Sequence, residues 1–246
     1  MPFTFAHPAF AFPLKFIRPR WFSVTGLVLG SMSPDFEYFL ALEPHQTIGH
    51  SFSGLLIQAI PLSILFAFLF HVVVKRTMVL HLPSVLDLNR RAYGLLSGWG
   101  LGTAREWLIF LMSVIIGFLT HVGLDSFTHE GGYMVKQLPW LQSNAIFDLP
   151  VYKLMQHGLS LLGLSAILIT LAAALWQSEP SAKRMPHIAG RRKWLFWCFS
   201  FLFALFVMGI KILVNDSGNY IGITVVATLT GFCAGLLIAS LIWRAP

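Results

Sequence analysis

Apolar residues fill five long stretches of the chain, at residues 51–74, 107–124, 158–176, 194–214 and 221–243. Each stretch is close to the roughly 20 residues that an α-helix needs to cross the hydrocarbon of a bilayer. Polar and charged residues gather in the segments between them. The pattern therefore predicts five transmembrane helices.

A sixth apolar segment, residues 21–42, is interrupted by Ser33, Pro34, Asp35, Phe36 and Glu37. Because proline breaks the helical hydrogen-bond ladder, this segment either spans with a kink or enters the bilayer and returns to the same side. We therefore expect an all-α fold, a polytopic integral membrane bundle of five to six transmembrane helices. The short interior loops predict a single membrane domain over residues 1–246.

Composition supports a lipid environment. Hydrophobic residues make up 56% of the 246 residues, charged residues only 11%, and the mean hydropathy is +0.72. Soluble domains usually carry about 25% charged residues. The bilayer is therefore the predicted principal partner, and the sequence leaves the oligomeric state open.

The net charge of +7 is distributed as a topology signal. Five Lys and Arg lie in residues 75–106 and five in 177–193, against two in 125–157 and none in 215–220. This alternation satisfies the positive-inside rule, so 75–106 and 177–193 are expected in the cytoplasm and 33–50 and 125–157 on the other side. Because the Lys and Arg residues cluster between the apolar stretches, the positive charge does not indicate nucleic acid as a partner.

The remaining ionisable residues concentrate at the non-cytoplasmic ends of the first spans. Charged groups near lipid are costly and mark functional sites by default. The histidines on the cytoplasmic side, His71, His81 and His187, are interpreted as structural. The ionisable residues at the non-cytoplasmic ends of the spans are Asp35, Glu37, His45, His50, His121, Asp125, His129, Glu130 and His157.

The sharpest motif is His121-x-x-x-Asp125-x-x-x-His129. On a continuous helix, residues four apart lie on one face, so all three side chains could converge on one metal ion. The alternative is a simple hydrogen bond between His121 and Asp125 at the end of a span. Two further polar clusters at the same depth favour the metal.

Those clusters surround Asp35 and His50. Pro34 turns the chain and can aim Asp35 inward as an oxygen ligand, although Pro-Asp is also a common turn or N-cap signal. Ser51 can cap the next span and place His50 at the membrane surface, whereas His45 is the weaker candidate.

His7 and His157 complete the candidate ligands. His7 can join only if residues 21–42 are re-entrant, because a full crossing would leave it on the opposite side. His157 precedes a span on the correct side and is either a ligand or an interfacial residue.

With these residues in hand, the chain resembles a bacterial membrane family known only as domain of unknown function 4184. The resemblance rests on His7-Pro8-Ala9, on residues 30–37, on the His121 to His129 motif and on Pro150-Val151-Tyr152-Lys153. It covers nearly the whole chain and implies a multi-pass protein of the bacterial inner (plasma) membrane, without implying an activity.

The order of ligand types also resembles, more distantly, membrane-bound metal-dependent hydrolases and the zinc-dependent phospholipase C fold. This resemblance implies metal binding by His7, Asp35, His50, His121, Asp125 and His129, with Asp125 as the bridging ligand. The phospholipase pattern ends in His-x-x-x-Glu, whereas Leu161 stands four residues after His157. That departure argues against a full three-metal site.

We therefore expect a hydrolase with one or two zinc ions, cleaving a phosphoester of a lipid or lipid-linked substrate at the non-cytoplasmic face. Glu37 and Glu130 are the candidate general bases. A transporter is the alternative, but it requires ionisable residues at mid-membrane, where Lys211 and Glu37 are the only candidates. A non-enzymatic protein with a structural metal or a polar cluster is the third hypothesis.

Overall fold

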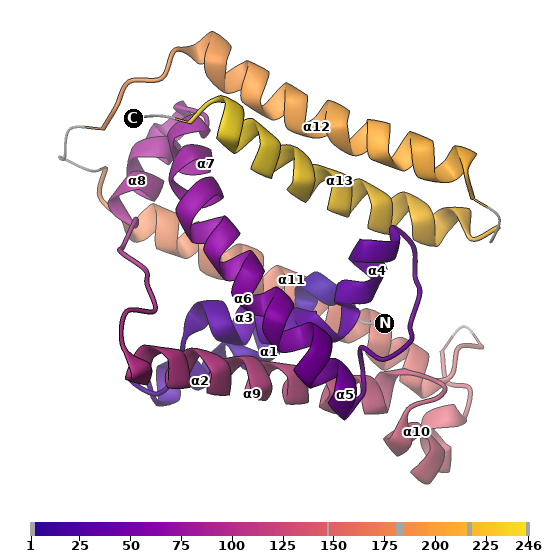
Figure 1. Cartoon of the computed structure of the whole chain (residues 1–246). Coiled ribbons are helices and arrows are strands. Elements are labelled where there is room, and N and C mark those ends of the chain that lie inside the picture. The colour runs from indigo at the N-terminus through magenta and orange to yellow at the C-terminus, as the bar shows by residue number, and fades with distance from the viewer. Residues whose placement is uncertain (1–2, 147, 181–184, 216–217, 245–246) are drawn as a thin grey trace. The chain divides into compact units, whose positions relative to one another are not determined.

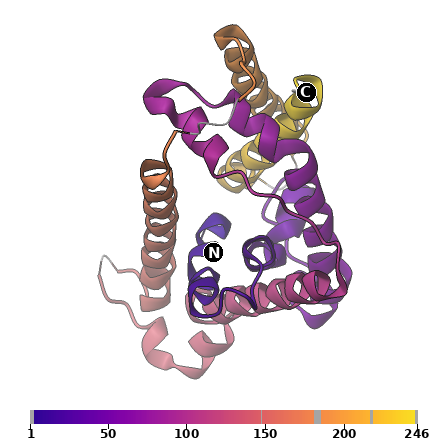
Figure 2. The same cartoon turned by 90° about the vertical axis from the view of Figure 1, so that its left-hand side faces the viewer.

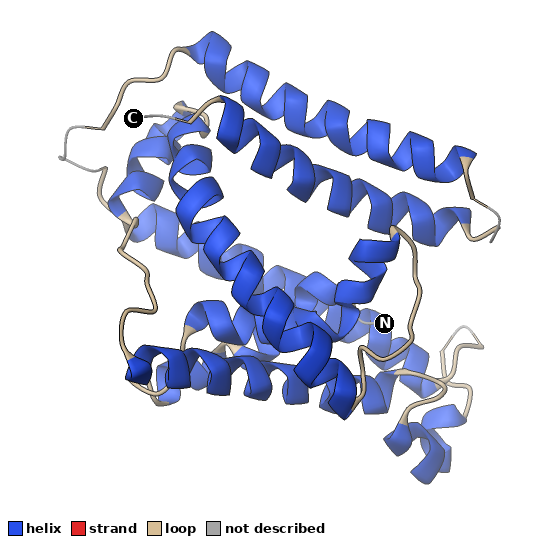
Figure 3. Ribbon diagram, in the orientation of Figure 1, coloured by secondary structure: helices blue, strands red, loops and turns tan. Residues whose placement is uncertain are grey.

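The computed structural model describes residues 3–146, 148–180, 185–215 and 218–244. Within these ranges every regular element is a helix (Figure 3). The β-type pairing in this part of the chain is limited to one isolated bridge between Asn144 and Pro150. The predicted all-α class is confirmed.

Five helical segments of the described chain are long and apolar enough to cross a membrane, which confirms the five predicted spans (Figure 1). The first consists of α5 (Phe52–Gly54), π-helix η3 (Leu55–Ala59), α6 (Ile60–Phe68), π-helix η4 (Leu69–Val74) and α7 (Lys75–His81). The others are α9 (Ala104–Thr128) with α10 (Tyr133–Gln137), α11 (Val151–Gln177), α12 (Gly190–Leu213) and α13 (Tyr220–Ile242). The chain is thus a multi-pass membrane protein.

Short helices make up the rest. They are η1 (Thr4–Ala6), α1 (Pro8–Ala11), α2 (Pro13–Ile17), α3 (Val24–Met32), η2 (Ser33–Asp35), α4 (Phe36–Ala41), η5 (Val85–Asp87), α8 (Leu88–Gly94) and η6 (Pro139–Gln142).

The structure divides residues 21–42 into α3, η2 and α4, and this segment is not among the five candidate spans. Ser23 caps α3 by accepting a hydrogen bond from the backbone N–H of Gly26. Pro34 then lies in the 3-10 turn η2, where its missing N–H and fixed φ suit the start of a turn. The predicted interruption at Pro34 is confirmed, and the choice between a kinked crossing and a re-entrant segment stays a prediction.

The chain forms two compact units. The first contains Met1–Phe36, Ile48–Ile64 and Gly100–Leu171, and the second contains Glu37–Thr47, Leu65–Trp99 and Ala172–Pro246. All candidate metal ligands belong to the first unit.

In the first unit, α3 and α9 are in backbone contact. A Cβ atom on Gly117 of α9 would lie 2.6 Å from the carbonyl oxygen of Leu27 and 2.7 Å from the backbone nitrogen of Ser31. A Cβ on Gly30 of α3 would in turn meet the backbone of Val114. Small residues permit such close approach between helices in a membrane. The contact brings the end of α3, and η2 after it, against the C-terminal half of α9.

In the second unit, α12 and α13 run side by side along most of their length (Figures 1 and 2). Gly231 and Gly235 of α13 face Ala204 and Ser200 of α12 at a distance that leaves no room for a larger side chain. This unit also holds His81, whose ring stacks on Phe196 at 4.5 Å between centroids, as befits a structural histidine.

Replacing Gly117 by Ala should destabilise the protein, because the added methyl group would clash with the backbone of α3. Overpacking of this kind typically costs about 1–3 kcal/mol. Gly123→Ala, on the same helix, is the matched control, since its added Cβ meets nothing within 4 Å. Thermal unfolding in detergent should show a lower midpoint for Gly117→Ala only. Equal midpoints for the two variants would contradict the close α3–α9 contact.

The predicted orientation can be tested by cysteine labelling in a variant without Cys198 and Cys233. Asn144, Gln137 and Gly100 are exposed, so a cysteine at each position can react. From outside intact cells, an impermeant thiol reagent should label cysteines at residues 137 and 144 but not at residue 100. The reverse labelling pattern would show that the positive-inside assignment is wrong.

Candidate metal centre

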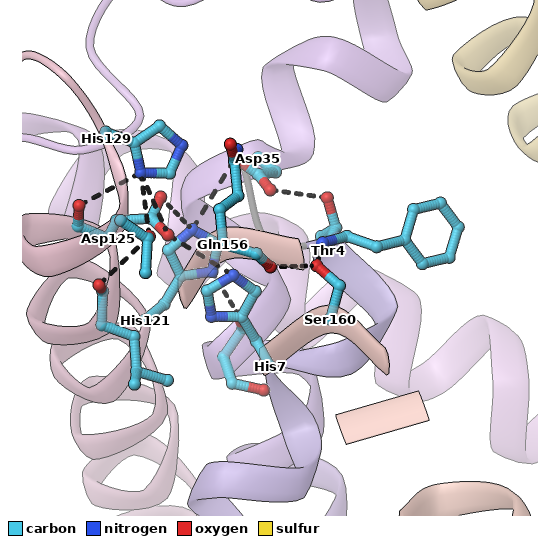
Figure 4. Close-up of polar contacts among 12 residues, drawn as sticks. Thr4, His7, Asp35, His121, Asp125, His129, Gln156 and Ser160 are labelled. Carbon is cyan, nitrogen blue, oxygen red and sulfur yellow. Dashed lines mark hydrogen bonds and ion pairs between the residues drawn. The ribbon is translucent and has the colours of Figure 1, made fainter. Parts of the chain in front are cut away.

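Six of the predicted ligands converge in the first unit. Figure 4 labels all of them except His50. They come from four separate parts of the chain. These are the segment between η1 and α1 (His7), η2 (Asp35), the turn before α5 (His50), and the C-terminal end of α9 with the residue that follows it (His121, Asp125 and His129).

Asp125 lies at the centre of the cluster. Its Oδ1 is 3.5 Å from Nε2 of His7, and its Oδ2 is 3.2 Å from Nε2 of His50 and 3.2 Å from Nε2 of His121. The Oδ1 atom of Asp35 lies 3.7 Å from Nε2 of both His50 and His121. The rings of His7 and His121 stack with centroids 3.7 Å apart. The Asp125 carboxylate thus lies among the rings of His7, His50 and His121, and the last two rings also lie beside Asp35.

Local structure explains the position of His7. It precedes Pro8, which occupies the first position of α1, where a proline is well tolerated. The ring is buried, with 1% of the residue exposed. The re-entrant alternative for residues 21–42, the only one in which His7 could be a ligand, therefore agrees with the observed geometry.

Asp35 is held by a residue that the sequence analysis did not identify. The hydroxyl of Thr4 donates a hydrogen bond of 2.6 Å to Oδ2 of Asp35, which is fully buried. This bond orients the carboxylate so that Oδ1 faces His50 and His121. A lone threonine near the N-terminus carries no pattern that could have indicated this role.

His121 is oriented by the backbone of α3. Its Nδ1 lies 2.6 Å from the carbonyl oxygen of Ser31, and because a carbonyl only accepts, Nδ1 must carry the proton. In the neutral ring, Nε2 is then the unprotonated nitrogen and presents its lone pair to the cluster. Metal-binding histidines commonly have this arrangement, with the second nitrogen donating to a carbonyl.

His129 reaches the cluster in a way that the helical spacing did not predict. The helix ends at Thr128, and His129 has an extended backbone (φ −120°, ψ 142°), so the three residues do not lie on one continuous helix. The ring nevertheless turns back, with Nδ1 3.1 Å from the carbonyl oxygen of Asp125 and 3.6 Å from its Oδ1. Its side chain is 30% exposed.

His50 is placed by the cap of the next helix. The Ser51 hydroxyl accepts a hydrogen bond of 3.0 Å from the backbone N–H of Gly54, which confirms the predicted N-cap. Its ring packs edge-on against His121, with centroids 5.2 Å apart.

The buried polar atoms of the cluster are poorly satisfied by hydrogen bonds. An unpaired buried polar group typically costs about 1–3 kcal/mol, so a group of them in one place calls for a ligand. Within the described chain, the cluster atoms without a hydrogen bond are Nδ1 and Nε2 of His7, Oδ1 of Asp35, Nδ1 of His50, Nε2 of His121, Oδ1 of Asp125 and Nε2 of His129.

Two overlapping sets of residues could each hold a metal ion. The first is His7, His121 and Asp125, and the second is Asp35, His50 and His121. Within each set, the candidate ligand atoms lie within 4.8 Å of one another. His121 belongs to both sets, and Asp125 contacts members of both.

Burial also determines the charge state of two ligands outside the spans. Burial, and next the neighbouring His121, lower the pKa of His7 to about 3. The ring is therefore neutral near pH 7, which is the form that binds a metal. Burial raises the pKa of the Asp35 carboxyl, as expected for a carboxylate removed from water.

The two candidate metal sets contain neither His157 nor Glu37. His157 is exposed on α11, while its neighbour Gln156 is buried and accepts a hydrogen bond from Lys153. Glu37 accepts hydrogen bonds from the backbone N–H and the hydroxyl of Thr47.

Neither Glu130 nor His45 is buried with the ligands. Both residues are exposed, Glu130 in the turn after α9 and His45 in the loop before α5. The two candidate metal sets contain neither of them. The structure thus brings together six of the seven predicted ligands and leaves His157 outside.

No curated protein and no solved structure matches the chain. One family does match, over residues 1–243, and its description is domain of unknown function, DUF4184. The match spans nearly the whole chain and includes every residue of the cluster, so this protein belongs to the family of domain of unknown function 4184.

Proposed function

We propose that the cluster is a zinc centre and that the protein is a metal-dependent hydrolase acting on a phosphoester of a lipid or lipid-linked substrate. One observation carries the proposal: His7, His121, Asp35 and Asp125 each have a buried ring nitrogen or carboxylate oxygen without a hydrogen bond, and with His50 they form two groups whose ligand atoms lie within 4.8 Å of one another. A cation bound by either group would give several of these atoms a partner.

The donor set favours zinc over other common ions. Zinc binds imidazole and carboxylate well, whereas calcium and magnesium prefer oxygen ligands alone. The two oxygens of Asp125 face different histidines, Oδ1 towards His7 and His129 and Oδ2 towards His50 and His121. This arrangement suits a carboxylate shared by two ions, so the centre we propose holds one or two.

The hydrogen-bonded alternative explains the cluster less well. If Asp125 and His121 only capped the end of α9, the atoms around them would be expected to have partners of their own. Instead, Oδ1 of Asp35 and Nε2 of His121 are both buried and lack a hydrogen bond. A metal accounts for these atoms, and a helix cap does not.

Hydrolysis would join the oxygen of a water molecule to phosphorus and break the bond from phosphorus to the alcohol oxygen, which takes up a proton. Bound zinc would lower the pKa of water to about 7 and neutralise charge on the phosphoryl group. His7, His121 and the two aspartates would hold the ion. We propose Glu37 or Glu130 as the group that accepts the proton.

A transport function has less support. Lys211, the charged residue nearest to mid-membrane in the sequence, lies in the last turn of α12 and pairs with Glu43 at 3.2 Å. The pair belongs at the end of a span rather than in a path through its centre. We place the metal centre at the non-cytoplasmic face of a bacterial inner membrane, following the positive-inside pattern.

Asp125→Asn and His121→Ala should each lower the affinity for zinc by about 10–100-fold, because each substitution removes a ligand or the partner of a ligand. The amount of zinc bound to the purified protein should fall accordingly. His187→Ala and His157→Ala are the controls, since both residues are exposed. Zinc per mole of purified protein, measured by elemental analysis, distinguishes the variants. If Asp125→Asn keeps its full zinc content, or the wild type never takes up stoichiometric metal, the zinc centre is disproved.

The double variant Asp125→Asn with His121→Ala should bind zinc little worse than either single variant. Residues that serve one ion act together, so their effects are not additive. The same elemental analysis applies. Additive losses would indicate that the two residues serve separate functions.

The hydrolytic activity can be tested on the zinc-loaded protein with phospholipid in mixed micelles. Phosphorylated headgroup or phosphate should be released, chelation should stop the release, and added zinc should restore it. Of Glu37→Gln and Glu130→Gln, the variant that lacks the base should lose activity and keep its zinc. A protein that retains stoichiometric zinc but releases no product from any phospholipid would have a structural metal instead.

A further inference from the structure

The second unit contains an open cavity of about 340 Å³ that has no part in the metal centre. Two cationic side chains, two aromatic rings and a serine contribute to its lining, and none of its residues is acidic. The polar and aromatic lining residues are His71, Lys75, Arg76, Tyr93, Ser97 and Trp99.

The cavity lies where a span leaves the hydrocarbon. The helical segments from Phe52 to Val74 rise through about the 30 Å of a bilayer core, and Lys75 and Arg76 follow directly. Tyr93 and Trp99 are residues of the kind that collects at the headgroup level of a membrane. Residues that directly follow a span in this way are expected at the depth of lipid phosphates.

The walls of the cavity are held in place by specific contacts. Trp99 stacks on His71 with ring centroids 4.2 Å apart and planes within 4° of parallel. It also packs edge-on against Phe68. The Nζ of Lys75 donates a hydrogen bond of 2.9 Å to the carbonyl oxygen of Ser97, which fixes the loop against the helix.

Both cationic side chains carry N–H donors that suit an anion. An ammonium group has three N–H donors, and the bond to Ser97 uses one of them. Arg76 is exposed and carries a guanidinium with five N–H donors in a plane that matches phosphate geometry. Lys75 is half-buried, so its charge is less screened than that of a freely exposed lysine.

The helix itself is irregular at this point. The π-helical segment Leu69–Val74 contains His71 and ends immediately before Lys75. Short π-helical segments are rare and occur frequently at functional sites. This irregularity is an observation independent of charge and coincides with the cavity wall.

We propose that this cavity binds the phosphate of an anionic phospholipid headgroup, with Lys75 and Arg76 contacting the phosphate oxygens and the hydroxyls of Tyr93 and Ser97 facing the polar headgroup. Basic cavities beside membrane spans recognise anionic lipids in this way. The site is separate from the metal centre and does not depend on its activity.

Binding can be measured with the purified full-length protein in a neutral detergent, using short-chain phosphatidylglycerol and phosphatidylcholine as probes. The wild type should bind phosphatidylglycerol at least about tenfold more tightly. Lys75→Gln with Arg76→Gln should abolish most of this preference, with a loss of about 10–30-fold. Equal affinity for the two lipids in the wild type would overturn the proposal without any variant.

The control removes the same number of charges outside the cavity. Arg90 pairs with Asp87 at 3.9 Å, and Arg105 lies at the start of α9, so Arg90→Gln with Arg105→Gln should change affinity by less than twofold. An equal loss in the control would show a general charge effect and contradict the site.

Inorganic phosphate distinguishes the source of the ligand. It should compete with phosphatidylglycerol only at millimolar concentration, because it lacks the glycerol and acyl groups. Full competition at the concentration of the lipid would identify a site for free phosphate and overturn the assignment to a lipid.

Discussion

The backbone contact between α3 and α9 is the constraint on which the candidate site depends. At Gly30 and Gly117 the backbones of the two helices come so close that no side chain fits between them. At that distance the Ser31 carbonyl reaches the ring of His121 and sets which nitrogen carries the proton. The same approach brings the turn after α3, with Asp35, within 3.7 Å of His121. One steric feature therefore determines both the tautomer of a ligand and the position of a second ligand.

The sequence predicted the spans well, because a helix in lipid must satisfy its own backbone and present apolar side chains over about 20 residues. Asp35, His50, His121 and Asp125 were also identifiable, since ionisable residues near lipid are rare enough to be informative. His7 depended on whether residues 21–42 cross the membrane. Hydropathy could not decide this, because Pro34 permits either path.

Three features of the site were beyond sequence reasoning. The Ser31 carbonyl is a backbone atom that every residue possesses, and the Thr4 hydroxyl has no distinguishing spacing. The direction of the His157 side chain was also not predictable. Helix α11 begins at Val151 rather than near residue 158, so His157 lies within the helix and its direction depends on its position around the helix axis. Successive residues differ by about 100° around a helix, and Gln156 takes the buried direction.

The position of His7 near the start of the chain affects how the site can assemble. During synthesis, Thr4 can meet Asp35 early, but the ring of His7 reaches Asp125 only after the span Phe52–His81 and most of α9 have been made and inserted. Until then the carboxylate of Asp35 and the imidazole of His7 lack their principal neighbours. Closing so long a loop has an entropic cost that grows with its length. The last two spans, α12 and α13, supply no residue to it, and the cluster can be complete while they are still on the ribosome.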